Sequence, residues 1–205
     1  MRKMIAVLAL LSLCLAGCTE SGEVKETEKI EETEEVTEVK EVIKADVAAY
    51  MGAIGTYYHD PIERGAELRA GVASLTVQFI LANPDCVEFE DGENEISVSA
   101  DEMDKVSVNL FGEFAKFSSL NLPFGVEKDG ENYRISKHYY DSSTIKYQLK
   151  THSVTHETDE EVHIRATYDY NSVSLAYAGS VSYTYVFEKT EEDGFEFLKL
   201  VSVEI

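Results

Sequence analysis

Two short clusters of the sequence combine tyrosine, histidine and aspartate, the residue types that exchange protons in many active sites. Residues 57–60 read Tyr-Tyr-His-Asp, and residues 138–141 read His-Tyr-Tyr-Asp, which is nearly the mirror image. In one shared pocket these groups could act as acid, base and orienting group. The competing interpretation, which we prefer, is that the tyrosines pack in the core and each His-Asp pair caps the end of an element. The candidate catalytic residues are His59 and Asp60 in the first cluster and His138 and Asp141 in the second.

Three further histidines, His152, His156 and His163, fall on two neighbouring predicted strands, and imidazole is a common zinc ligand. If Thr155 pairs with Val162, all three rings share one solvent-facing side of the sheet. His163 then lies about 7 Å diagonally from each of the others. His152 and His156 are about 13 Å apart along their strand, too far for all three to reach one ion easily. We therefore prefer a solvated polar face to a metal site.

The remaining chemistry-bearing patterns are weak. The sequence contains no nucleophile elbow, phosphate-binding loop or dinucleotide fingerprint, so we expect no cofactor. The acidic run from Glu88 to Glu95 could bind calcium, but it lacks the ordered spacing of a calcium loop, and a solvated hairpin is preferred. Cys86 lies at the edge of an apolar run, which favours a buried structural thiol over a reactive one.

The first 18 residues have the three parts of an export signal. A basic start is followed by the almost entirely apolar residues 5–15, and residues 15–18 read Leu-Ala-Gly-Cys. The apolar run is too short to span a bilayer. The last four residues resemble the lipobox of bacterial lipoproteins, which is cleaved between Gly17 and Cys18. The alternative is an ordinary secretory signal with a chance cysteine.

The lipobox resemblance implies that the protein is anchored to the cell membrane on its extracytoplasmic side, through diacylglycerol on Cys18. We expect a signal peptide over residues 1–17, a lipidated cysteine and tether over 18–45, and one domain over 46–205. Residues 19–45 contain ten glutamates, four lysines and no aromatic residue, a composition that cannot fold alone. Repulsion between these charges predicts an extended tether.

The charge of the whole chain limits its partners. With 39 acidic and 18 basic residues, the formal charge is −21. Such a chain repels phosphate backbones, so we expect no nucleic-acid partner. It also repels anionic lipid headgroups, so membrane attachment must be covalent or hydrophobic.

The two halves of the domain differ in periodicity. Apolar residues spaced by three and four predict helices over about 47–58, 62–81 and 99–114. The third of these opens with a capping box, in which Ser99 caps the helix and Glu102 reaches back. The second half alternates with period two, which predicts antiparallel strands with one buried face. The predicted strands are 124–128, 131–136, one from Thr144, 162–170, 181–187 and 195–204.

This alternation makes a specific prediction about the sheet. A one-residue slip would exchange its two faces. We expect the aromatic set, which is Tyr168, Tyr183, Tyr185 and Phe187, to face the helices. We expect the basic set, which is His163, Arg165 and Lys150, to face solvent.

Helices followed by antiparallel strands indicate an α+β fold, with N-terminal helices packed on a curved antiparallel sheet. This order resembles the NTF2-like and cystatin-like folds, in which a bent sheet wraps a helix into a cone. The ending, with residues 183–187 and 194–197 around a turn, is similar to the closing hairpin of that group. The chain has Phe195 and Phe197 where a tryptophan often stands there.

Three functions agree with these observations. The preferred one is a non-catalytic module that binds a small ligand or another envelope protein. The second is a small NTF2-like hydrolase or isomerase that uses a Tyr/His/Asp pocket. The third is a structural assembly factor that works through exposed strand edges. A filled interior of the cone would favour contact through edges over binding in a pocket.

Overall fold

The computed structural model describes residues 42–139, 145–172 and 177–205. The expected signal peptide, Gly17, Cys18, most of the tether and Asp141 lie outside these ranges. The chain divides into a unit of residues 1–38 and a unit of residues 39–205, and the described residues all belong to the second. Within them the fold is α+β, as the sequence predicts. No helix in these ranges is long and apolar enough to cross a membrane.

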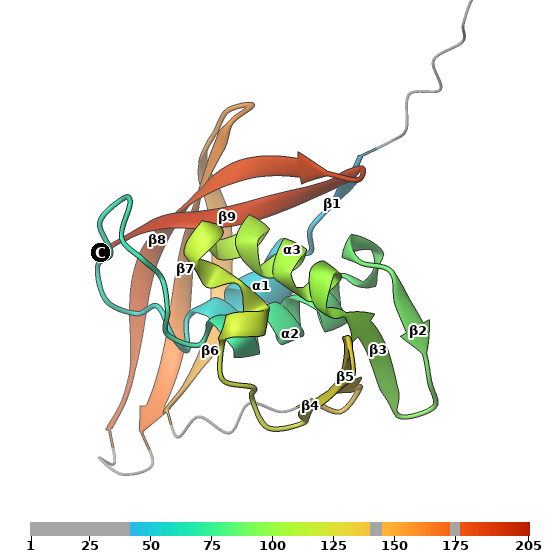
Figure 1. Cartoon of the computed structure of the whole chain (residues 1–205). Coiled ribbons are helices and arrows are strands. Elements are labelled where there is room, and N and C mark those ends of the chain that lie inside the picture. The colour runs from blue at the N-terminus through green and yellow to red at the C-terminus, as the bar shows by residue number, and fades with distance from the viewer. Residues whose placement is uncertain (1–41, 140–144, 173–176) are drawn as a thin grey trace, which may run out of the picture. The chain divides into compact units, whose positions relative to one another are not determined.

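Strands of the described chain form two sheets, where the sequence predicted one (Figure 1). The large sheet has the order β1-β9-β8-β7-β6 and is antiparallel except for β1, which is parallel to β9. The small antiparallel sheet has the order β2-β3-β5-β4. Large-sheet strands are β1 Ile43–Lys44, β6 Ile145–Glu157, β7 Glu161–Ser172, β8 Tyr177–Glu192 and β9 Phe195–Glu204. Small-sheet strands are β2 Phe89–Asp91, β3 Glu95–Ser99, β4 Val126–Asp129 and β5 Asn132–Ser136.

The small sheet arises because two acidic or polar hairpins pair with each other. The turn at Gly130, with φ 63°, joins β4 to β5, as predicted from its Asp-Gly sequence. The acidic run that contains Glu90 and Asp91 forms the β2–β3 hairpin, and β3 pairs with β5. The β4–β5 hairpin is therefore not part of the large sheet, contrary to the prediction of one curved antiparallel sheet.

The described residues form three α-helices: α1 Val47–Ile54, α2 Val72–Ala82 and α3 Ala100–Phe111. Short 3₁₀ turns follow α2 and α3, at η1 Pro84–Cys86, η2 Glu113–Ala115 and η3 Phe117–Ser119. The Ser99 hydroxyl accepts a hydrogen bond from the Glu102 backbone N–H at 3.2 Å, which confirms the cap. The Glu102 carboxylate instead accepts from Lys105 at 2.8 Å, so the reciprocal half of the predicted capping box is not formed.

The helix predicted over 62–81 is wrong in its first half. Ile62 pairs with Val203 of β9 through two backbone hydrogen bonds of 2.9 and 3.0 Å, so this part of the chain is held as a bridge to the sheet. Gly65 and Gly71 have φ values of 88° and 66°, which a right-handed helix does not allow. Helix α2 therefore begins only after Gly71, and residues 60–71 form a loop.

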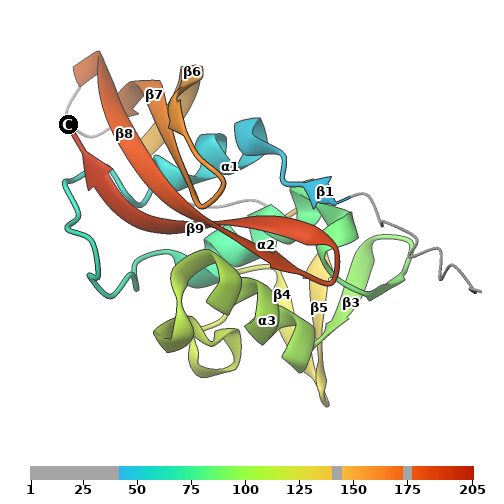
Figure 2. The same ribbon diagram turned by 90° about the horizontal axis from the view of Figure 1, so that it is seen from above.

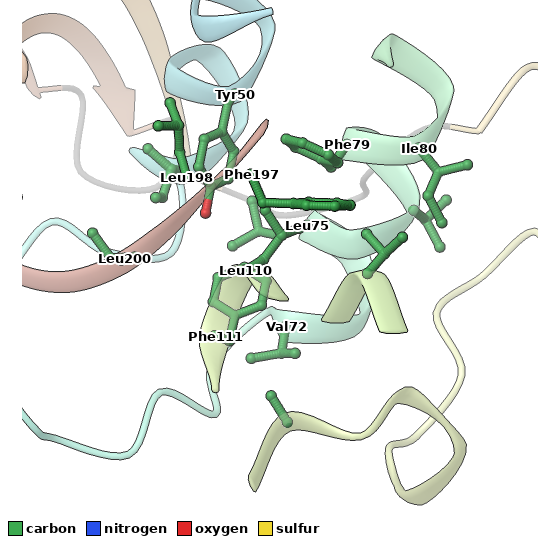
Figure 3. Close-up of a cluster of buried hydrophobic side chains, with 14 of the residues drawn as sticks. Tyr50, Val72, Leu75, Phe79, Ile80, Leu110, Phe111, Phe197, Leu198 and Leu200 are labelled. Atoms are coloured by element: carbon green, nitrogen blue, oxygen red, sulfur yellow. The ribbon is translucent and has the colours of Figure 1, made fainter. Parts of the chain in front are cut away.

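Helix α2 lies between α1 and α3, next to the large sheet (Figure 2). Its apolar side chains meet those of β9 in the core (Figure 3). The Phe79 ring stacks on Phe197 with centroids 6.0 Å apart and meets Tyr50 of α1 edge-on at 5.4 Å. Full burial of each such apolar side chain contributes about 1.5–3 kcal/mol to the free energy of folding. Leu75 and Phe79 of α2 pack with the aromatic side chains of the strands in one core.

Candidate functional site

The face of the large sheet that packs on the helices, here called the inner face, is filled by aromatic side chains. Tyr168, Tyr185 and Phe187 are completely buried and Tyr183 is nearly so, as the alternation predicts. The Tyr168 hydroxyl donates to the Met51 carbonyl at 2.7 Å, and the Tyr185 hydroxyl donates to the Tyr58 carbonyl at 2.9 Å. Their polar ends are therefore satisfied by the backbone that forms and follows α1, and they are not presented to a ligand.

The backbone that follows α1 packs closely against the aromatic side chains of the inner face. A Cβ placed on Gly55 would lie 2.4 Å from a ring carbon of Tyr168, so only glycine allows this approach. Burial raises the pKa of Tyr185 and Tyr168 well above the usual tyrosine value. Both rings stay neutral at physiological pH, which suits a structural role.

The candidate residues His59 and Asp60 lie at one end of the inner face, where α1 has ended. The His59 ring stacks on Tyr147 of β6, with centroids 4.8 Å apart and planes 19° from parallel. The His59 Nδ1 is buried and has no hydrogen-bond partner among the described residues. Burial raises the pKa of Tyr147 and of Tyr183, and the negative charge of the exposed Asp60 raises both further. The first cluster thus meets two tyrosines of the sheet.

The first cluster supplies part of an acid–base site, and the second cluster does not complete it. It supplies an imidazole, a carboxylate and the Tyr147 and Tyr183 hydroxyls, which share a hydrogen bond. The raised pKa keeps both tyrosines protonated, so they could donate protons but not accept them. The second cluster lies on the other sheet, where His138 is exposed in the turn after β5. The structure does not bring His138 to the inner wall of the large sheet, and Asp141 lies outside the described residues.

The prediction that three histidines share one face is wrong. Glu157, not Thr155, pairs with Val162, so His156 lies directly opposite His163, with ring centroids 5.0 Å apart. His152 pairs with the buried Ala166 and therefore belongs to the inner side. Two register shifts in β6, between Leu149 and Thr151 and between Val154 and His156, cause the difference. Each bulge adds one residue and reverses the side-chain alternation.

On the opposite side of the sheet, here called the outer face, charged groups hold the 60–71 loop. His163 Nε2 lies 2.6 Å from Glu161, and Arg64 of the loop pairs with the same carboxylate. Arg64 also reaches Glu188 at 3.1 Å. Hydrogen bonds from His163 and Arg64 hold the pKa of Glu161 below its usual value. Within the described ranges, no three His, Cys, Asp or Glu side chains are grouped so that they could hold a metal ion.

Acidic residues of the β2–β3 hairpin are also used in ion pairs. Lys137 pairs with Asp91 at 2.5 Å, and Arg134 reaches Glu95 at 3.6 Å. Arg134 also pairs with Glu127 at 2.9 Å. These carboxylates are divided between two cations of the small sheet and do not converge as calcium ligands do.

A notch on the inner face, of about 220 Å³, lies where the β6–β7 hairpin approaches β1. Its floor is apolar, and Lys189 pairs across its rim with Glu157 at 2.5 Å. Val154 of β6 is half exposed beside it, with 51% of its surface accessible. The apolar lining consists of Ala45, Val47, Val154, Val162, Ile164 and Leu198.

Sequence reasoning missed this notch and the role of Arg64. Val154 and Val162 could be assigned only to strands, because their pairing depends on the two bulges of β6. Arg64 fell within a predicted helix, where its partner on β7 could not be seen. Cys86, by contrast, is buried as predicted, and burial raises the pKa of its thiol to about 12.

No protein-family profile, curated protein or solved structure matches this chain.

Proposed function

We propose that the protein is a membrane-anchored, extracytoplasmic lipoprotein whose domain is a non-catalytic binding module of the cell envelope. The lipobox at residues 15–18 and the acidic tether support the anchoring part of the proposal. Helices that precede antiparallel strands support an NTF2-like or cystatin-like relationship for the domain. The second, small sheet is a departure from a simple cone.

One observation carries the binding part of the proposal: the inner face is filled. Tyr168 and Tyr185 have no exposed surface, and their hydroxyls bond to backbone carbonyls. Where the interior is occupied by the protein's own side chains, recognition has to use the surface. We therefore favour a partner that binds outside the core, with the tether supplying reach from the membrane.

The anchoring is tested by replacing Cys18 with alanine in cells that produce the full chain. We expect the wild-type protein to be processed and to fractionate with membranes, and Cys18→Ala to stay unprocessed or be released. A processed, membrane-bound Cys18→Ala protein would contradict the lipoprotein assignment. A mass spectrum of the mature N-terminus gives the same answer independently, because diacylglycerol adds a defined mass to Cys18.

A second candidate function, a small hydrolase or isomerase, is favoured by the contact between His59 and Tyr147 beside Asp60. It predicts that His59→Ala abolishes turnover of a substrate while the domain keeps its fold. The binding proposal predicts that His59→Ala changes thermal stability only, through the lost stack. A loss of turnover without a loss of stability would place the enzyme first.

A further inference from the structure

Strand β6 is one of the two edge strands of the large sheet, and β1 is the other (Figures 1 and 2). One edge of β6 pairs with β7. No strand in residues 42–139, 145–172 and 177–205 pairs with its other edge. Residues 151–157 are all exposed. An unpaired edge leaves backbone N–H and C=O groups that can hydrogen-bond an added strand. The two bulges bracket a regular segment, Thr151–Val154, which pairs in step with residues 164–167 of β7.

The inner side of this edge offers an apolar contact. Val154 pairs with Ile164, which is buried, so its side chain points to the inner side while half of its surface stays accessible. The notch of about 220 Å³ begins at Val154 and extends over Val162 and Leu198. A strand added beside β6 would place every second side chain on this side, next to the notch.

Two cationic side chains, Arg165 and Lys150, lie on the outer side of the same edge. Arg165 pairs in register with Ser153, is exposed, and has no ion-pair partner among the described residues. Lys150 is also exposed, and its ammonium pairs with Asp169 through a hydrogen bond of 3.4 Å. The domain as a whole carries 29 acidic and 12 basic residues, so an exposed unpaired arginine differs in charge from the surface average. Side chains on the outer side of an added strand would meet these cations.

We propose that β6 binds an extended segment of a partner protein as an additional strand, with apolar residues of that segment facing the notch and acidic residues facing Arg165 and Lys150. The inference rests on the proposed function as a binding module and names its surface and the chemistry of its partner. Backbone hydrogen bonds supply affinity in this mode of recognition, and alternate side chains supply specificity. A second copy of the chain fits less well, because its β6 edge would present the same cations, and the nearby carboxylates of Glu157 and Asp169 are already paired with Lys189 and Lys150.

The probe is a labelled nonapeptide of alternating valine and glutamate, titrated into the full chain in mild detergent and followed by fluorescence anisotropy. The comparison peptide has lysine in place of glutamate. We expect the acidic peptide to bind on the order of tenfold more tightly, with an affinity that falls as salt is added. Amide hydrogen exchange in β6 should slow when this peptide is bound. Failure of the acidic peptide to bind at about 1 mM, or equal binding of both peptides, would overturn the inference.

Two variants locate the contact. Arg165→Glu should weaken the acidic peptide about fivefold and strengthen the lysine peptide, whereas the matched control Arg69→Glu should change neither. Val154→Glu should weaken both peptides, because it places a charge beside the notch. Circular dichroism confirms that each variant is folded. Equal effects of Arg165→Glu and Arg69→Glu would show that binding occurs elsewhere and overturn the β6 assignment.

Self-association is measured on the same samples by light scattering. A dimer of the wild-type chain that Val154→Glu dissolves would mean that a second copy occupies the edge, which overturns the inference about an acidic partner. That outcome, like a failure of the peptide, leaves the anchoring result on Cys18 and the binding role unaffected. An unprocessed or unanchored wild-type protein would contradict the proposed function itself.

Discussion

Replacing Tyr185 with alanine should destabilise the domain by about 3–5 kcal/mol, the range for truncation of a buried aromatic side chain. Tyr185 has no exposed surface, and its ring contacts those of Tyr168 and Phe187 with centroids 6.3 and 6.4 Å away. Alanine would leave a cavity at the centre of the inner face. Tyr185→Phe would keep the ring and lose the hydroxyl with its hydrogen bond to the Tyr58 carbonyl, at a cost of about 1–2 kcal/mol.

The assay is urea unfolding of the full chain followed by circular dichroism, with a thermal melt of the same variants. For a domain of this size, a destabilisation of 1 kcal/mol lowers the melting midpoint by about 2–4 °C, so Tyr185→Ala should lower it by roughly 6–20 °C. The matched control is Phe124→Ala, since Phe124 is 88% exposed and its truncation should change stability by less than about 0.5 kcal/mol. If Tyr185→Ala cost less than about 1 kcal/mol, the inner face would not be a packed core, and the argument that recognition uses the surface would fail.

Three further predictions follow from burial and close approach. Gly55→Ala should destabilise the domain by about 1–3 kcal/mol because its Cβ would strike Tyr168, whereas Gly52→Ala, within α1 and with open space around it, should stabilise by about 0.5–1 kcal/mol; opposite signs in urea unfolding test both. Native Cys86 should react slowly with iodoacetamide at pH 8, because burial raises its pKa to about 12, and quickly in denaturant; fast native labelling would contradict its burial. Burial raises the pKa of tyrosines such as Tyr168, so as pH rises the unfolded chain loses their protons before the folded chain does. The free energy of unfolding should therefore fall above about pH 10, the usual tyrosine pKa, and a value that stays constant up to about pH 11 would count against this burial.

The parts of the fold that follow from local pattern could be predicted. Alternation placed Tyr168 and Tyr185 on the buried face and Arg165 on the exposed face, because the period of a strand fixes which side chains share a side. The Ser99 cap was predictable because its hydrogen bond joins residues three apart.

The parts that depend on partners distant in the chain could not be predicted. Apolar spacing alone suggested a helix from Ile62, but the backbone of Ile62 pairs with Val203, 141 positions later. The histidine register failed for a related reason, since the bulges in β6 are visible only from its pairing with β7. The candidate site shows both effects. His59 stacks on Tyr147, a residue outside both Tyr/His/Asp clusters, and His152 lies on the opposite side of the sheet from His163.

The central claim, that an anchored domain engages a partner through its surface, is tested most directly by photo-crosslinking in intact cells. A photoreactive amino acid is placed at Ser153, which is exposed on β6 opposite Arg165, and in a second strain at Lys116, which is exposed after α3. We predict one discrete protein adduct from position 153 that weakens when Arg165→Glu is added, and no such adduct from position 116. No adduct from position 153, or the same adducts from both positions, would contradict the account.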